Sequence, residues 1–192
     1  TPEKQNDMDT GLIAKRYATA LADFAAANGE EQRVYDEVQH LIAVYKTEPS
    51  LRDALLSPVL PVTAKEALFR QVLDSGSSRT LDGFFSLVLH RRREKYLYFM
   101  LYSYLSLYKR RHGILDAALT TAASVSDETA ERITSIVRMR TRSREVRLHR
   151  KADESLIGGF VFRMDDLLLD ASLSRQLNLL RKQLGRKQNR IV

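Results

Sequence analysis

The fold is decided by the stretch EKYLYFMLYSYLSLYKRRHGILDAALTT, residues 94–121, because the spacing of its apolar residues changes at Gly113. Before Gly113 the apolar side chains recur every three or four residues, which predicts a helix over 94–111. After Gly113 they alternate with other residues at a period of two, which predicts a β-strand. We therefore expect a helical domain over residues 1–112 and a domain that contains a sheet over residues 113–192.

The first domain contains five further segments with apolar residues at helical spacing. Each ends at a glycine, at a proline or in a polar turn. These helices are predicted over 10–28, 30–47, 50–56, 63–73 and 79–91. Thr10 is expected to cap the first helix, and Thr63 and Glu66 are expected to form a capping box that opens the fourth. Six helices with short connections predict an antiparallel bundle.

The second domain is expected to be a small α+β fold with the element order β-α-β-β-β-α, so the whole chain is mainly α. After the strand that follows Gly113, Ser126 or Asp127 is expected to cap a helix that ends near Arg140. Further strands are predicted over 146–148, 156–164 and 167–169, with a hairpin turn at 165–166, before a final amphipathic helix over 172–185. Gly158 and Gly159 indicate a close approach of another backbone or a bulge.

Composition and motifs argue against an enzyme. The chain has 192 residues, a net charge of +7 and no cysteine. The lack of cysteine excludes disulfides, thiolate metal sites and a cysteine nucleophile. The four histidines are not at metal-ligand spacing, and no phosphate-binding glycine motif or nucleophile elbow is present. We expect no catalytic site, no metal and no cofactor.

The positive charge is uneven, with a net +2 over residues 1–112 and +5 over residues 113–192. The basic residues gather in Arg91-Arg92-Arg93, in Lys109-Arg110-Arg111 and in a spaced set of Arg138, Arg140, Arg142, Arg144, Arg147 and Arg150. Such clusters can bind phosphates, so a basic nucleic-acid-binding accessory protein is the alternative function. However, cations also complement the C-terminal ends of helices, and no aromatic residues interleave with the spaced arginines. We favour a protein that binds other proteins and no nucleic acid.

Four segments of the sequence resemble the conserved segments of a known protein family. They are AKRYATAL at 14–21, LSPVL at 56–60 followed by Lys65, HRRR at 90–93 followed by Leu97, and DESLIGGFVFR at 153–163 followed by LLDASL at 168–173. Together they resemble the delta subunit of F-type ATP synthases, called the oligomycin-sensitivity-conferring protein in mitochondria, over about residues 12–184. The family usually has glycine where this chain has Asp165 and Ala171. Aspartate tolerates left-handed backbone conformations, whereas alanine requires a negative φ.

The resemblance implies a non-catalytic connector in the peripheral stalk. Such a subunit links the α/β catalytic head to the b-subunit stalk and resists rotor torque during proton-driven ATP synthesis. It implies that the N-terminal helix of an α subunit binds between the first and fifth helices. The matching positions are Ala14, Tyr17, Ala18, Leu21, Phe84, Leu87 and Val88. Packing within the bundle core is the other interpretation of each of these residues.

The resemblance also implies that the C-terminal end of the b subunit binds the second domain. The candidates on its last helix are Leu177, Leu180, Arg181 and Leu184, of which the leucines are also suited to contact the domain's own sheet. No stretch reaches the roughly 18–20 uncharged apolar residues of a membrane helix, and no signal peptide is visible. We expect an isolated monomer that reaches the membrane only through the complex. The expected location is the cytoplasmic face of a bacterial inner membrane, or the matrix or stromal face in an organelle.

Overall fold

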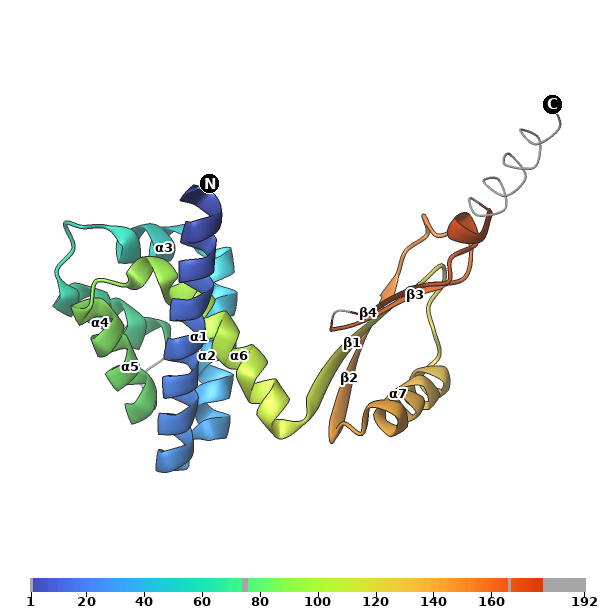
Figure 1. The fold of residues 1–192 in the computed structure, drawn as a ribbon, viewed down its shortest axis with the longest axis horizontal. Coiled ribbons are helices and arrows are strands. Elements are labelled where there is room, and N and C mark those ends of the chain that lie inside the picture. Colours follow the sequence, from blue (N-terminus) through green and yellow to red (C-terminus); the bar gives the residue numbers. More distant parts are fainter. Residues whose placement is uncertain (1, 74–75, 166, 178–192) are drawn as a thin grey trace. The chain divides into compact units, whose positions relative to one another are not determined.

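The computed structural model describes residues 2–73, 76–165 and 167–177, with side chains described from Thr10 onward. The chain is mainly helical with a small four-stranded sheet (Figure 1). It divides into two compact units, Thr1–Lys109 and Arg110–Val192. Within the described ranges, no helix is both long enough and apolar enough to cross a membrane.

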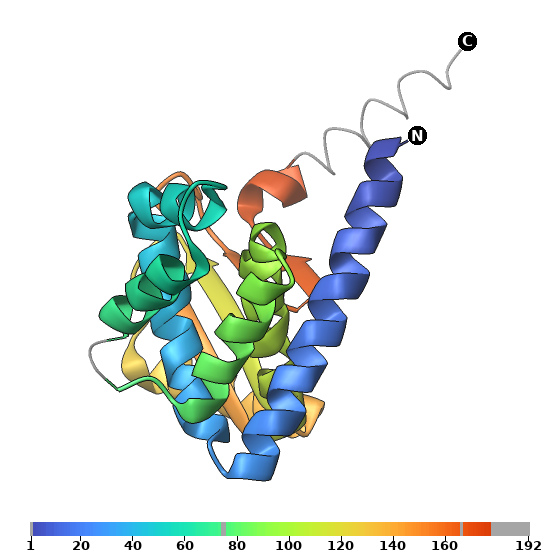
Figure 2. The ribbon, with the colours of Figure 1, turned by 90° about the vertical axis from the view of Figure 1, so that its left-hand side faces the viewer.

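The first unit is built from helices whose apolar sides face one another. These helices are α1 (Pro2–Asn28), α2 (Glu31–Thr47), α3 (Pro49–Leu56), α4 (Val62–Val72), α5 (Arg79–His90), the short 3₁₀ helix η1 (Glu94–Tyr96) and α6 (Leu97–His112). α1 contacts both α2 and α5, and α4 also packs on α5 (Figure 2). The stacked rings of Phe69 and Phe85, with centroids 3.8 Å apart, join α4 to α5. Tyr35 and Tyr108 stack at 4.2 Å and join α2 to α6.

Two predicted helix starts are wrong. α1 begins at Pro2, so Thr10 lies inside the helix rather than at its cap. α4 begins at Val62, so Thr63 is helical and the predicted capping box does not open the helix. Pro61 takes the cap position instead, because its backbone is extended and its carbonyl accepts hydrogen bonds from the backbone N–H groups of Ala64 and Lys65.

Glutamates on and beside α2 hold the segment that leads into α5. Glu37 accepts hydrogen bonds from the backbone N–H of Ser78 at 2.8 Å and from its hydroxyl at 2.6 Å. Glu30, just before α2, accepts from the backbone N–H of Thr80 at 3.1 Å and from its hydroxyl. Ser78 and Thr80 are fully buried, so these carboxylates satisfy donors that water cannot reach.

The second unit contains a mixed sheet. Its elements are β1 (Ile114–Thr121), α7 (Asp127–Thr141), β2 (Glu145–Ala152), β3 (Phe160–Met164) and β4 (Leu167–Asp170). The strand order is β2-β1-β3-β4, with β1 and β2 parallel and the other pairs antiparallel. α7 packs on β2 and is capped by Ser126, which accepts a hydrogen bond from the backbone N–H of Thr129, as predicted.

The prediction of a strand over 156–164 is wrong in its first part, because β3 begins only at Phe160. Gly159 has a φ of +81°, and a side chain there would collide with the carbonyl oxygen of Ala171. This confirms the close backbone approach expected at the glycine pair. Asp165 has a φ of +46°, the left-handed conformation expected of it, whereas Ala171 is not among the described residues with positive φ.

The last helix begins after Ser172, near the predicted start. Residues 173–177 are helical, and the Ser172 hydroxyl accepts a hydrogen bond from the backbone N–H of Arg175. Asp170 accepts a hydrogen bond from the backbone N–H of Ser172 at 3.0 Å, and its hydrogen bonds with Ser172 hold the pKa of the Asp170 carboxyl below its usual value. The predicted end of this helix at Gly185 lies outside the described residues.

Candidate partner-binding sites

A hollow of about 340 Å³ lies between α1 and α5 in the first unit. α1 contributes Arg16, Tyr17 and Ala20, α5 contributes Leu87, and Arg91 and Arg93 follow the end of α5. Leu87 is 47% exposed and Tyr17 is partly exposed, so apolar surface is accessible in the hollow. This is the helix pair between which the family resemblance implies that a partner helix binds.

Tyr17 is held in place from two directions. Its ring meets Phe84 edge to face, with the centroids 6.3 Å apart. Arg93 donates a hydrogen bond from Nη1 to the Tyr17 hydroxyl at 3.2 Å, and its guanidinium carbon lies 5.3 Å from the ring centroid. Arg93 is itself fixed by a backbone hydrogen bond to Val88 in α5. These contacts hold the Tyr17 ring in a fixed position at the hollow.

The seven residues predicted to contact the N-terminal helix of an α subunit fall into two groups in the structure. Five of them are buried in the chain's own core, namely Ala14, Ala18, Leu21, Phe84 and Val88. Tyr17 and Leu87 line the hollow. Sequence reasoning did not assign Arg16, Ala20, Arg91 and Arg93 to this site. The sequence does contain features that could indicate three of these residues. Ala20 lies on the apolar stripe of α1, and Arg91 and Arg93 belong to a basic cluster.

The charge around this hollow is positive. Arg16, Arg91 and Arg93 are three of its six lining residues, and no carboxylate is among them. Across the described ranges, no ion pair involves any of the three guanidinium groups. An apolar floor with a cationic rim is the arrangement that receives an amphipathic helix with apolar anchors and carboxylates beside them.

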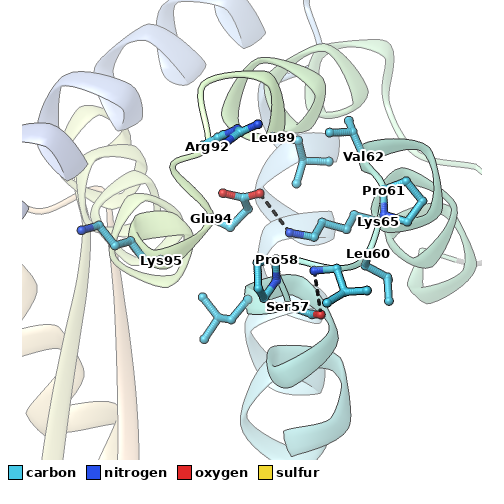
Figure 3. Close-up of a pocket in the computed structure, with 12 residues that line it drawn as sticks. Ser57, Pro58, Leu60, Pro61, Val62, Lys65, Leu89, Arg92, Glu94 and Lys95 are labelled. Carbon is cyan, nitrogen blue, oxygen red and sulfur yellow. Dashed lines mark hydrogen bonds and ion pairs between the residues drawn. The ribbon is translucent and has the colours of Figure 1, made fainter.

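A second hollow, of about 480 Å³, lies in the same unit beside the extended connector between α3 and α4. Lys65 of α4 reaches Glu94 of η1 and donates a hydrogen bond to it at 3.0 Å (Figure 3). The Lys65 side chain is only 6% exposed and that of Glu94 14%. The pair neutralises itself and ties α4 to η1, so we interpret this hollow as a structural junction.

The lining of the α1–α5 hollow is arginine, tyrosine, alanine and leucine, whereas the second hollow contains the paired Lys65 and Glu94. Among the described residues, no cluster of three His, Asp or Glu side chains could hold a metal ion. The lining of the α1–α5 hollow contains no carboxylate, histidine, serine or cysteine. Its chemistry is that of a binding surface.

In the second unit, only part of the predicted stalk contact can be placed. Leu177 lies on the described start of the last helix and is 53% exposed. Leu180, Arg181 and Leu184 lie outside the described residues. Arg175, on the same turn, pairs with Asp170 at 3.5 Å and links the helix to the end of β4.

Residues 13–184 match the family model described as "ATP synthase delta (OSCP) subunit". The chain belongs to this family. It is similar to the protein named "ATP synthase subunit delta" of Phocaeicola vulgatus, with 38% identity over 96% of this chain and 100% of the relative. The protein of that name from Salinibacter ruber is 32% identical over 92% of this chain and 93% of the relative.

The fold of the delta subunit is also found in a solved assembly. A chain of the cryo-EM structure of the Toxoplasma gondii mitochondrial ATP synthase hexamer superposes with a TM-score of 0.70 at 19% identity. The match covers 90% of this chain and 97% of that chain. As a delta (OSCP) subunit, the chain is a non-catalytic subunit of the peripheral stalk of the F-type ATP synthase. The alternative of a nucleic-acid-binding accessory protein gains no support.

Proposed function

We propose that the chain joins the catalytic head of the ATP synthase to the b-subunit stalk, with one unit for each partner. In this proposal the helices over residues 1–112 form an antiparallel bundle that binds the N-terminal helix of an α subunit. Residues 113–192 bind the C-terminal end of the b subunit. The joint resists the torque of the rotor, so the head stays still while protons drive the central shaft.

The observation that carries the proposal is the hollow between α1 and α5. Tyr17 and Leu87 supply an apolar floor, and Arg16, Arg91 and Arg93 supply positive charge around it. Ala14 and Ala18 of the predicted set are buried in the chain's own core, so this proposal assigns the partner contact to Tyr17 and Leu87 instead.

The stalk contact is proposed on the last helix. Leu177 is exposed on its described start, and Leu180, Arg181 and Leu184 continue the candidate set. The bacterial relatives favour the cytoplasmic face of a bacterial inner membrane as the location. The subunit reaches that membrane through the complex and is a monomer when isolated.

The experiment is a calorimetric titration of the full chain with a peptide of the first residues of the same organism's α subunit. Roughly 20 residues suffice, because they form about 30 Å of helix. We expect one-to-one binding that persists at moderate salt, since the floor is apolar. A nucleic-acid ligand would instead lose roughly 10³–10⁵ in affinity between 50 and 200 mM salt.

The variant Leu87→Glu tests whether the peptide binds in the hollow between α1 and α5. It puts a carboxylate into the hollow at a position that is already 47% exposed, so the fold tolerates it. Leu56→Glu is the control, because Leu56 is 45% exposed but lines the other hollow. The proposal requires that Leu87→Glu abolish binding and that Leu56→Glu leave it unchanged. No binding by the wild type, or equal binding by both variants, would contradict it.

A further inference from the structure

The C-terminal half of α7 and the turn into β2 carry positive charge without compensation. Residues 132–144 contain five arginines and no carboxylate. All five are exposed, and they are Arg132, Arg138, Arg140, Arg142 and Arg144. Over the described part of the chain, no ion pair or side-chain hydrogen bond involves any of their guanidinium groups.

Two other arginines of the same spaced set form ion pairs within the unit. Arg147 pairs with Glu145 at 2.6 Å, and Arg150 pairs with Asp127 at 2.7 Å. The unit therefore supplies carboxylates to these two arginines and leaves the other group open. The helix dipole explains why arginines occur in the last turn of α7, where Arg138 and Arg140 lie. It does not explain why apolar side chains are exposed beside them.

Two apolar side chains lie among these arginines. Met139 is 80% exposed and Ile136 is 58% exposed. They are three residues apart, so they lie on the same side of the helix, one turn from each other. The opposite side of α7 is used by the unit itself, since Ala130 is buried and the helix packs on β2 (Figure 1). We call Ile136, Met139, Arg132, Arg140, Arg142 and Arg144 the arginine patch. Arg132 and Arg140 lie on the same side of α7 as the two apolar side chains, whereas Arg138 lies roughly 160° around the helix from Ile136.

We propose that the arginine patch binds an acidic amphipathic helix of the stalk, with Met139 and Ile136 as apolar anchors and the arginines paired to carboxylates. This inference rests on the proposed function, in which the second unit binds the b subunit. It adds a contact surface that is separate in sequence from the last helix. Arginine suits this role because its planar guanidinium pairs with a carboxylate through two parallel hydrogen bonds.

Charge and apolar surface together favour a protein partner over other anions. Phosphates would use the arginines but not the exposed Met139. A lipid surface requires a helix with a whole apolar side to insert, and α7 keeps only Ile136 and Met139 outside. An acidic amphipathic helix uses both features at once.

The test is a titration of the full chain with a soluble fragment that contains the C-terminal end of the same organism's b subunit. Met139→Ser and the double variant Arg132→Gln/Arg140→Gln are compared with wild type. Arg150→Gln is the matched control, because it removes an arginine of the same set that is already paired. We expect each patch variant to weaken binding by about tenfold or more, as central interface residues do, and the control to change it little. Thermal melts check that every variant is folded.

Each outcome is decisive. If the fragment binds and all variants bind like wild type, the arginine patch is not the contact and the proposed function stands. If the fragment does not bind the wild type, both the stalk-binding proposal and this inference fail. Duplex DNA and vesicles with anionic lipids are titrated in parallel. One combination of results would show that the partner proposed here is wrong. DNA or vesicles would bind wild type, bind the arginine double variant more weakly and bind Met139→Ser as well as wild type. The affinity of the b-subunit fragment would be the same for wild type and for every patch variant.

Discussion

Arg93 holds Tyr17 through a hydrogen bond and a cation–π contact at once. Its Nη1 donates to the phenol oxygen at 3.2 Å, and its guanidinium carbon lies 5.3 Å from the ring centroid. The contact joins α1 to the turn after α5, and both residues line the hollow. Because the Tyr17 ring is already ordered, its side chain loses less conformational freedom when a partner binds.

Tyr17→Ala is expected to weaken binding of the α-subunit peptide by more than about 1 kcal/mol, as aromatic anchors of interfaces do. The chain should remain folded, because Tyr17 is only partly buried. The measurement is calorimetric titration beside a thermal melt. Leu12→Ala is the control on the same helix, at a residue 69% exposed and outside the hollow. If stability fell as much as affinity, Tyr17 would be a core residue instead.

Lys65→Ala is expected to lower the free energy of unfolding by about 3 kcal/mol, because it leaves the largely buried Glu94 carboxylate without its counter-charge. The double variant Lys65→Met/Glu94→Leu should recover most of that loss, since it removes both charges together. Urea unfolding curves give both values. A loss below about 1 kcal/mol in the single variant would show that water solvates Glu94 in the hollow.

Gly159→Ala is expected to destabilise the second unit by about 2–4 kcal/mol. The substitution combines a φ of +81° with a collision against the backbone of Ala171. Gly83→Ala is the opposite case, because Gly83 lies inside α5 with open space around it. That variant should stabilise the chain by about 0.5–1 kcal/mol. Both are measured by thermal unfolding, and a tolerated Gly159→Ala would contradict the close approach.

Arg142→Gly is expected to raise stability by about 1 kcal/mol, since Arg142 ends α7 with a φ of +56°, where glycine has no steric cost. The same variant should weaken binding of the b-subunit fragment, because it removes one arginine of the patch. Melting and titration of one sample test both effects. Lower stability would show that the Arg142 side chain supports the fold.

Glu30 predicts a pH dependence of stability. The Thr80 hydroxyl and backbone N–H hydrogen-bond the Glu30 carboxylate, and this lowers its pKa from the usual 4.5. A lowered pKa in the folded state stabilises the fold above the unfolded-state pKa, and the contribution is lost as the pH falls through the folded-state value. Glu30→Gln should therefore flatten the decline of unfolding free energy between neutral and acid pH. The exposed Glu48→Gln is the control, and equal curves for Glu30→Gln and wild type would refute the link.

Much of the fold follows from apolar spacing alone. The change of period at Gly113 marks the step from α6 to β1, and the left-handed φ of +66° at Gly113 explains why glycine stands there. Apolar spacing does not locate the first residue of a helix. Pro61 caps α4 through its extended backbone, whereas the side-chain pattern pointed to Thr63.

The proposed binding site can be predicted only to the level of the helix pair, which the family resemblance implies. Periodicity identifies the apolar sides of α1 and α5, but a core contact and a partner contact have the same spacing. Ala14 and Tyr17 lie on neighbouring positions of α1, and only the packed structure shows that one is buried and the other lines the hollow. The role of Arg93 depends on a contact across 76 residues, which no local pattern records.

The most direct test of the connector is sedimentation of three components together. The purified catalytic head is mixed with the soluble part of the b subunit, with and without this chain. If the chain is the connector, the b subunit sediments with the head only when the chain is present, and Leu87→Glu releases the b subunit together with the chain. Sedimentation of the b subunit with the head in the absence of the chain, or none in its presence, would show that the chain is not the connector.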